Sequence, residues 1–497
     1  MIALDAYRGR KIAVLGLARS GLASAQALAE SGAQVRAWDN DAGACHAAAA
    51  TGIPLADLAT EDAAGWAALV MSPGIPLTHP APHPIAAKAL AAGVPVIGDI
   101  ELLWQAGTGA RFLGITGTNG KSTTTALIGH ILGQARHPVA VGGNLGTPVL
   151  TLPALGADGT YVIEMSSFQL DLIAATRFAV AILLNVTPDH LDRHGDMAGY
   201  VAAKKRIFMN QLPGDTAIVG VDDDWCAAVA DALDRNKVGR ASRPPAGGTP
   251  APQTVAAPSS AGRSPAGGDL ERSRPVVRIS VERPVPGGVY VLDGTLIDDT
   301  DRTERVVTDL KQIPRLPGAH NWQNAAAAYA ACRACGLTVA EIVEGLTSFA
   351  GLAHRQELVA RIGKVRFIND SKATNADAAA KALGCYDAIH WIAGGVPKSG
   401  GIEPLRSFFP RIRRAYLIGS AAKQFQETLG EAVPSSLSGD LPTAVREAAV
   451  AAKQDPAEAP VVLLSPACAS FDQYRNFEIR GDAFRDIVRD LALEAAR

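Results

Sequence analysis

Two glycines, a lysine and a hydroxyl are closely spaced in Ile115–Ser122, which reads ITGTNGKS. Gly117 and Gly120 allow the backbone to fold around phosphate oxygens. Lys121 can reach terminal phosphates, and Ser122 can offer its hydroxyl to Mg²⁺. An isoleucine stands where the standard pattern has its first glycine, six residues before the lysine. An apolar strand precedes the segment and an apolar helix follows, so a phosphate-binding loop explains it better than an incidental turn.

Two side chains further along the chain can complete a metal site. Glu164 ends the predicted strand Tyr161–Met165, and an acid on a strand beside the phosphate-loop strand is well placed to ligate Mg²⁺. His190 follows the next strand, Ala179–Asn185. Because Mg²⁺ prefers oxygen ligands, the chemistry leaves His190 equally open as a ligand and as a structural residue.

A second glycine motif lies near the N-terminus. Residues 16–21 read GLARSG, with Ala18 in place of the middle glycine of a dinucleotide-binding fingerprint, and Asp39 stands where a ribose-binding acid is expected. An alanine at this position limits close approach of the backbone to a pyrophosphate. A structural tight turn and a nucleotide site explain the motif equally well.

Lysine-bearing loops follow two predicted strands near the C-terminus. DSKATN, with Lys372, follows Val365–Asn369, and GGVPKSGG, with Lys398, follows Ile389–Ala393. Ligands of open α/β sheets bind at the carboxyl ends of strands. We expect the two lysines at adjacent strand ends, where they form a pocket for carboxylate or phosphate, although either lysine alone would fit a solvated surface position.

Composition limits the class of protein. The 497 residues carry a formal net charge of −2, so nothing indicates a nucleic-acid or membrane partner. The CxxC pair Cys332 and Cys335 lies in an Ala-rich helical run, where core packing explains it better than zinc or redox chemistry. No signal peptide and no membrane-spanning run is visible. We therefore expect a cytoplasmic protein, and a monomer.

Strands and helices alternate along the whole chain, which predicts an α/β protein with parallel sheets. We predict three domains, at residues 1–102, 103–350 and 351–497. Residues of about 241–275 are rich in Pro, Gly, Ser and Ala without periodicity. Such a segment cannot bury enough apolar surface to offset its ordering entropy, so we expect a disordered surface insert within the second domain.

Several motifs, in this order, resemble the Mur ligase family. They are TGTNGKST, EMSSFQL, LNVTPDHLDRHG, the AAK of Ala202–Lys204, GAHNWQN, HRQE, NDSKATN and LLSPACASFDQYRNF. The resemblance spans nearly the whole chain apart from the insert. It implies an N-terminal Rossmann-like domain for a UDP-linked substrate, a central P-loop ATPase with a mainly parallel sheet, and a C-terminal Rossmann-like domain for an amino acid.

The resemblance also implies a role for individual residues. Those implied to contact the UDP-linked substrate are Ser20, Asp39, Ser72, Gly74 and Asn144. Those implied to bind ATP are Gly117, Thr118, Asn119, Gly120, Lys121, Ser122, Thr123, Asn321, Asn324, Arg355 and Asp370. Those implied to bind the amino acid are Lys372, Thr374, Lys398, Ser470 and Phe477. Val396 departs from family members that carry an acid there, which leaves the positioning of Lys398 open.

Metal binding and catalysis are implied for a smaller group. The metal ligands would be Ser122, Glu164, His190 and Lys204, and the catalytic residues Lys121, Glu164, His190 and Lys204. By resemblance Lys204 carries a CO₂-derived carbamate, and two Mg²⁺ ions bind. Lys205 is adjacent, so this assignment rests on spacing within AAKKRIF. An oxygen-bearing carbamate suits Mg²⁺ better than an amine.

The loops NDSKATN and SPACAS resemble the branch of the family that adds D-glutamate. This implies an ADP-forming ligase of peptidoglycan precursor synthesis that activates the carboxylate of UDP-N-acetylmuramoyl-L-alanine as an acyl phosphate. Two lysines match the two carboxylates of glutamate, whereas the choice of the D-form rests on the resemblance. The alternatives are another amino acid, a nicotinamide oxidoreductase, and a regulatory or motor ATPase.

Overall fold

The computed structural model describes residues 2–144, 146–240, 275–398 and 400–495. The chain divides into two compact units, residues 1–308 with 323–346 and residues 309–322 with 347–497. Nearly all of the predicted insert, residues 241–274, lies outside the described residues. Within the described ranges, no helix combines the length and the apolar character that crossing a membrane requires.

The first sheet is four-stranded and parallel, in the order β2-β1-β3-β4. Its strands are β1 (Lys11–Leu15), β2 (Gln34–Trp38), β3 (Ala68–Met71) and β4 (Val96–Ile97). Its helices are α1 (Arg19–Glu30), α2 (Ala42–Ala50), α3 (Pro84–Ala91) and α4 (Asp99–Gln105). The sequence predicts strands at Lys11–Gly16 and Gln34–Asp39, and β1 and β2 confirm both.

The second sheet has nine strands, and the strand that leads into the phosphate loop lies inside it. The order is β13-β12-β11-β10-β9-β8-β5-β7-β6. The strands are β5 (Arg111–Thr116), β6 (Val139–Gly143), β7 (Thr160–Glu164), β8 (Val180–Leu183), β9 (Thr216–Gly220), β10 (Val276–Ser280), β11 (Val289–Leu292), β12 (Thr295–Asp298) and β13 (Arg305–Asp309). Apolar runs predict β5, β7, β8 and β9, and the strand-like run VVRISVERPV matches β10. The strand-like run GGVYVLDGTLI covers both β11 and β12, and β6 and β13 were not predicted.

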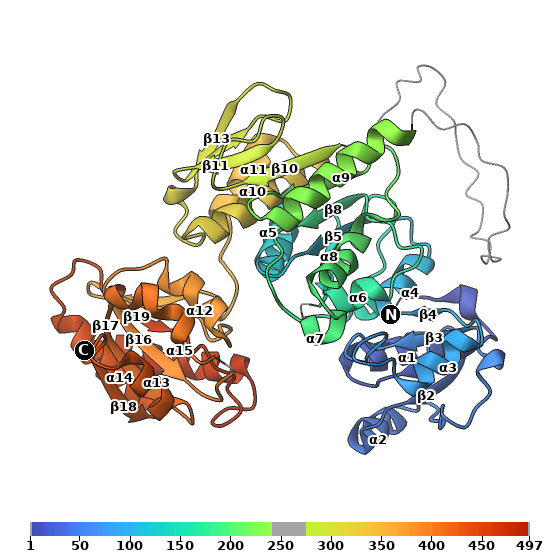
Figure 1. The fold of residues 1–497 in the computed structure, drawn as a ribbon, viewed down its shortest axis with the longest axis horizontal. Coiled ribbons are helices and arrows are strands. Elements are labelled where there is room, and N and C mark those ends of the chain that lie inside the picture. The colour runs from blue at the N-terminus through green and yellow to red at the C-terminus, as the bar shows by residue number, and fades with distance from the viewer. Residues whose placement is uncertain (1, 145, 241–274, 399, 496–497) are drawn as a thin grey trace. The chain divides into compact units, whose positions relative to one another are not determined.

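The helices of this second part follow the strands along the chain (Figure 1). They are α5 (Lys121–Gln134), α6 (Ser167–Asp171), α7 (Leu191–His194), α8 (Met197–Lys205), α9 (Asp224–Arg240), α10 (Ala319–Ala334) and α11 (Val339–Ser348). Cys332 is buried in α10, whereas Cys335 follows the end of that helix and is half-buried. Both are free thiols, so only Cys332 fits the predicted position within a helix.

The third sheet has the order β14-β15-β19-β16-β17-β18, with β14 antiparallel to β15 and the other pairs parallel. Its strands are β14 (Glu357–Ile362), β15 (Val365–Asn369), β16 (Ile389–Gly394), β17 (Ile412–Ile418), β18 (Ser435–Gly439) and β19 (Val461–Leu464). Its helices are α12 (Ala376–Leu383), α13 (Ala422–Leu429), α14 (Leu441–Gln454) and α15 (Phe477–Ala495).

This strand order corrects one prediction. Lys372 follows β15 and Lys398 follows β16, but β19 lies between these two strands, so the lysines do not come from adjacent strand ends. The inserted strand arrives from nearly seventy residues further along the chain. Hydrogen-bond pairing between such distant segments is decided by tertiary packing, which order along the chain does not reveal.

Alternating side chains of the third sheet build two cores, one on each face. Ile368, Trp391 and Leu417 belong to the core with α12 and α13, whereas the core with α14 and α15 contains Phe367 and Ile392. A parallel sheet covered on both faces needs apolar residues at successive positions, and the observed strands meet this requirement. The predicted fold class, α/β with three sheet-based parts, is confirmed (Figure 1).

Candidate active site

The phosphate loop joins β5 to α5, as predicted. Gly120 has a φ of 83°, and a Cβ at this position would lie 2.3 Å from Asn324 Oδ1, so only glycine fits. The ammonium of Lys121 donates to the carbonyl oxygens of Gly117, at 2.9 Å, and Thr118, at 2.8 Å. A cation is therefore held within the loop by the backbone of the loop itself.

Lys204 lies against the same loop. Its Nζ donates to the carbonyl oxygen of Gly117 at 2.8 Å and sits 4.5 Å from the centre of the Tyr200 ring. The residue is only 1% exposed, and this burial, together with the charge of Lys121, holds its pKa well below the usual range. Lys205, the next residue, is exposed. The helix phase thus turns one lysine toward the phosphate loop and the other toward solvent.

Glu164 ends β7, which pairs with β5, so its carboxylate lies beside the phosphate-loop strand. The residue is 2% exposed. Its Oε1 accepts a hydrogen bond of 2.7 Å from Asn144 Nδ2, whereas its Oε2 is buried without a hydrogen-bond partner among the described residues. A buried carboxylate oxygen without a donor is costly unless a cation or a donor joins it, so this geometry fits a metal ligand.

His190 follows β8 and precedes the short helix α7. Its φ of 53° places the backbone in the left-handed region, which non-glycine residues enter at a cost and often at functional sites. Its ring stands edge-on to Phe168, with 4.9 Å between centroids, and its Nε2 lies 3.4 Å from Asp189 Oδ2. Partial burial lowers the pKa of His190, which favours the neutral imidazole that can act as a ligand.

Three of the four implied metal ligands lie on α5, β7 and α8, and the fourth, His190, directly precedes α7. Ser122 is buried in the first turn of α5, Glu164 ends β7, and Lys204 lies on α8. Where the structure describes the chain, it contains no cluster of three or more His, Cys, Asp and Glu residues suited to a metal. The implied set includes only two residues of those types, Glu164 and His190.

A cavity of about 530 Å³ opens beside the first sheet. All five residues implied to contact the UDP-linked substrate line it: Ser20, Asp39, Ser72, Gly74 and Asn144. The cavity also includes residues after β6, so it reaches from the first sheet to the second. Asn144 lines the cavity and donates to Glu164, which links this cavity directly to the buried Glu164 carboxylate.

The N-terminal glycine motif has a structural part and a ligand-facing part. Asp39 Oδ2 accepts a 2.6 Å bond from the backbone N of Leu17, and Ser72 Oγ donates to the Gly16 carbonyl at 3.0 Å. A Cβ at Gly21 would lie 1.8 Å from the Gly16 oxygen, so this glycine is needed for close packing of α1 on the turn. The motif is therefore a braced turn that also borders the cavity.

Three residues outside the phosphate loop that are implied to bind ATP, Asn321, Asn324 and Asp370, differ in their contacts. Asn324, on α10, accepts from Thr124 Oγ1 at 3.1 Å and so faces the phosphate loop. Asn321, on the same helix, donates to the Pro317 carbonyl at 2.8 Å. Asp370 is buried, and this burial raises its pKa to about 7, although bonds from Ser465 Oγ and a backbone N and the charge of Arg355 oppose the shift.

The residues implied to bind the amino acid lie on loops after β15, β16 and β19 and at the start of α15. The Lys372 ammonium lies 3.9 Å from the centre of the Phe477 ring, an arrangement that holds a cation by the ring face. Thr374 follows Lys372 in the same loop, Lys398 is exposed and Ser470 is buried. The order of strands places the Ser470 loop between the two lysine loops.

Val396 stands where some family members carry an acid, and its backbone pairs with that of Ala469. Its N donates to the Ala469 carbonyl at 2.8 Å, and the Ala469 N returns a bond of 3.1 Å. The Val396 side chain is partly exposed. An acid at this position would thus not be needed for the pairing that fixes the loop two residues before Lys398.

Three residues near the candidate sites were not predicted from the sequence. Asn185 Oδ1 accepts from the phosphate-loop N of Asn119 at 2.9 Å. Gln169 lines the cavity and forms a capping box with Ser166 at the start of α6, and the spacing Ser-x-x-Gln in EMSSFQL is a signal for such a box. Arg480, buried on α15, carries no local signal of its position.

Comparisons with known proteins agree with the geometry. Residues 115–243 match the Mur ligase middle domain. A UDP-N-acetylmuramoylalanine–D-glutamate ligase of Rhodospirillum rubrum is 52% identical over 99% of this chain and 97% of its own length. One of Mesorhizobium japonicum is 50% identical over 98% of this chain and 97% of its own.

Solved structures are similar in fold. A UDP-N-acetylmuramate-alanine ligase from Thermotoga maritima aligns with a TM-score of 0.53 at 18% identity, over 97% of this chain and 99% of that chain. A UDP-N-acetylmuramoyl-L-alanyl-D-glutamate–2,6-diaminopimelate ligase aligns with a TM-score of 0.51 at 18% identity, over 86% of this chain and 93% of its own. At such identities the likeness concerns the fold alone.

Proposed function

The chain belongs to the Mur ligase family, and we propose that one group of its residues binds ATP and Mg²⁺, a second binds the UDP-linked substrate and a third binds the amino acid. The reaction is the ADP-forming addition of D-glutamate to UDP-N-acetylmuramoyl-L-alanine in peptidoglycan precursor synthesis. ATP supplies the energy and Mg²⁺ is required. In the proposed path, the substrate carboxylate takes the terminal phosphoryl group of ATP and ADP leaves. The amine of glutamate then attacks the acyl carbon of this acyl phosphate, and phosphate leaves as the amide bond forms.

One observation carries the assignment of the phosphate site. The nitrogens of Lys121 and Lys204 both donate to the carbonyl oxygen of Gly117, in the loop between β5 and α5. Attack of a carboxylate on a phosphate brings anions together, so the protein must neutralise charge and align the reacting groups. Lys121 and the loop amides of Gly117–Thr123 perform this task in the proposed site.

The residues beside this loop fit Mg²⁺ and a carbamate on Lys204. The unpartnered Oε2 of Glu164 supplies an anionic oxygen, and Ser122 and His190 complete the proposed ligand set. When bound, Mg²⁺ would neutralise phosphate charge. The lowered pKa of Lys204 favours the neutral amine, which is the form that reacts with CO₂. We propose that two ions bind and that a carbamate on Lys204 would supply an oxygen ligand.

The cavity of about 530 Å³ is the proposed site of the UDP-linked substrate. Ser20, Asp39, Ser72, Gly74 and Asn144 line it together. The bond from Asn144 to Glu164 joins the wall of this cavity to the proposed metal site, which is where the substrate carboxylate must meet the terminal phosphate of ATP. Nucleotides and an amino acid are water-soluble substrates, which supports action in the cytoplasm.

The C-terminal loops are the proposed site of glutamate. Lys372 and Lys398 provide a cation for each carboxylate, and Thr374 and Ser470 add neutral donors. Phe477 holds the Lys372 ammonium from one side. Asn321, Asn324, Arg355 and Asp370 are proposed to bind the adenosine part and the phosphates of ATP.

The test is the substrate requirement of ADP release. Purified protein with ATP and Mg²⁺ should release ADP only when UDP-N-acetylmuramoyl-L-alanine and D-glutamate are both present. A regulatory or motor ATPase would release ADP from ATP alone. Reduction of a nicotinamide cofactor in the same mixture, without ADP, would indicate an oxidoreductase and reject the proposal.

A further inference from the structure

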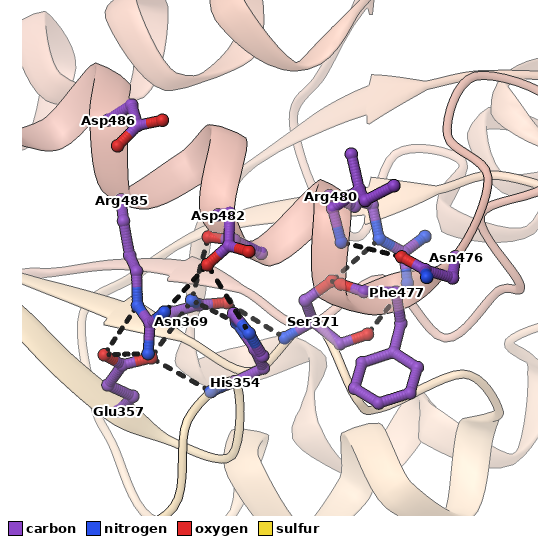
Figure 2. Close-up of polar contacts among 12 residues, drawn as sticks. His354, Glu357, Asn369, Ser371, Asn476, Phe477, Arg480, Asp482, Arg485 and Asp486 are labelled. Atoms are coloured by element: carbon purple, nitrogen blue, oxygen red, sulfur yellow. Dashed lines mark hydrogen bonds and ion pairs between the residues drawn. The ribbon is translucent and has the colours of Figure 1, made fainter.

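Arg480, in the second turn of α15, is the largest polar side chain buried near the proposed glutamate site. It is only 1% exposed. Its Nε donates to Ser371 Oγ at 3.0 Å, and its Nη2 donates to the carbonyl oxygens of Ser371 at 2.8 Å and of Cys468 at 3.1 Å. Figure 2 shows the guanidinium of Arg480 reaching from the helix to Ser371.

The buried Arg480 guanidinium forms its hydrogen bonds with backbone carbonyls and a hydroxyl and not with a carboxylate. Within the described ranges, no carboxylate lies within ion-pair distance of Arg480, and its Nη1 is buried without a hydrogen-bond partner. Burial lowers its pKa to about 10. A buried charge that lacks an opposite charge costs stability, so stability alone does not explain an arginine at this position.

The groups that Arg480 binds belong to two neighbouring loops of the proposed pocket. Ser371 directly precedes Lys372 on the loop after β15, and Cys468 stands two residues before Ser470 on the loop after β19. These two strands are neighbours in the sheet. The distance between Lys372 and Ser470 is therefore set partly by a single guanidinium.

The contact between Arg480 and Ser371 extends to Phe477, which also belongs to the proposed pocket. Ser371 Oγ, which accepts from Arg480 Nε, donates in turn to the carbonyl oxygen of Phe477 at 2.8 Å. Phe477 begins α15, and its ring faces the Lys372 ammonium at 3.9 Å. Arg480 thus joins the start of the helix, the Lys372 loop and the Ser470 loop into one hydrogen-bonded unit.

We propose that Arg480 is a positioning residue that sets the affinity for the amino-acid substrate by fixing the Lys372 and Ser470 loops relative to each other. This inference rests on the proposed glutamate site. Arg480 does not touch the substrate, because its guanidinium is enclosed by the backbone and side chains of those loops. Its replacement should therefore change amino-acid binding and leave binding of the UDP-linked substrate unaffected.

Arg485 offers a matched control on the same helix. Its guanidinium donates to Glu357 Oε1 and to Asp482 Oδ1, both at 2.8 Å, and it is largely buried. Figure 2 shows these contacts around Glu357, at the start of β14, whose other oxygen accepts from Asn369, and Asn369 in turn accepts from the Ser371 N. Replacing Arg485 removes a comparable number of hydrogen bonds from the helix, whereas the direct bonds of Arg480 to Ser371 and Cys468 stay in place.

The experiment compares Arg480→Met, Arg480→Lys and Arg485→Met with the unmodified protein. The measurements are the KM for D-glutamate, the KM for UDP-N-acetylmuramoyl-L-alanine and the melting temperature. Since misplacement by about an ångström can cost a hundredfold, we expect Arg480→Met to raise the KM for D-glutamate by about tenfold or more. Arg480→Lys, which can still donate to the Ser371 and Cys468 carbonyls, should give an intermediate value. Arg485→Met should lower the melting temperature but not raise this KM.

The inference is overturned if folded Arg480→Met keeps the KM for D-glutamate, or if both KM values and the melting temperature change alike in Arg480→Met and Arg485→Met. Should Arg480→Met fail to fold, the KM of Ser371→Ala for D-glutamate is measured instead, because this change removes only the Oγ that joins Arg480 to Phe477. A raised KM supports the inference, and an unchanged KM overturns it. If the unmodified protein prefers another amino acid, the glutamate assignment fails, and the same comparison with the preferred amino acid still tests Arg480.

Discussion

The phosphate loop and the proposed amino-acid pocket both place lysines after the carboxyl ends of parallel strands, but they hold those lysines differently. Lys121 bonds carbonyl oxygens three and four residues before it. The Lys372 ammonium packs on the ring of Phe477, which is more than a hundred residues away in the sequence. The first site is built by one continuous segment, whereas the second exists only when several distant loops are assembled.

This difference explains what the sequence could predict. Strand, glycine turn, lysine and helix follow one another in residues 111–134, so the phosphate loop was predicted with its elements and its lysine. Four strands of the C-terminal sheet, β15, β16, β17 and β19, were also predicted from apolar runs, whereas β14 and β18 were not. The order of the strands was not predicted, because β19 enters between β15 and β16 through pairing that only the folded sheet determines.

Other residues stayed unpredicted for similar reasons. β18 reads SSLSG and is an edge strand, so it lacks the apolar pattern that identifies buried strands. Arg480 lies in the charged run EIRGDAFRD, where burial of one arginine leaves no mark on the sequence. Lys204 and Lys205 differ only by helix phase, and burial of Lys204 agrees with the choice made from spacing.

Removal of the phosphate-loop cation should have the largest effect. Lys121→Ala is expected to lower turnover on the order of a hundredfold or more, since electrostatic stabilisation at the reacting phosphate is lost. Turnover is measured as ADP release, with folding checked by circular dichroism. Turnover close to that of the unmodified protein would show that this lysine does not serve the reaction.

The adjacent lysines of α8 give a matched pair. Lys204→Ala should lose most activity, because the buried side chain against Gly117 is removed, whereas Lys205→Ala should keep it, because Lys205 is exposed. Added short carboxylates should restore part of the activity of Lys204→Ala by replacing the proposed carbamate. An inactive Lys205→Ala, or full activity in both variants, would reject the assignment.

The assembled pocket is tested by its two lysines. Charge-assisted hydrogen bonds are worth about 1.5–3 kcal/mol, so Lys372→Ala and Lys398→Ala should each raise the KM for D-glutamate by about tenfold or more. Lys372→Ala also removes the contact with the Phe477 ring. An unchanged KM in Lys398→Ala would remove the exposed lysine from the site.

The smallest expected effect concerns Asp370 and pH. Burial raises its pKa from 3.8 to about 7, so between these pH values the folded protein keeps a proton that the unfolded chain releases. Stability from this group is therefore present at low pH and lost as pH rises to about 7. Asp370→Asn cannot titrate, so its melting temperature should rise relative to that of the unmodified protein between pH 4 and 7. A constant difference across this range would show that Asp370 does not titrate there.

The central claim, that the phosphate site and the amino-acid pocket together make a D-glutamate ligase, is tested most directly by amino-acid selectivity. The measurement is kcat/KM with UDP-N-acetylmuramoyl-L-alanine and ATP for D-glutamate, L-glutamate, D-aspartate and D-glutamine. D-glutamine would leave one lysine of the pocket without a carboxylate, and D-aspartate is too short to reach both lysines with its amine aligned. We predict that D-glutamate is used far better than the other three. Equal use of D-glutamine, or ADP release that needs no amino acid, would contradict the account.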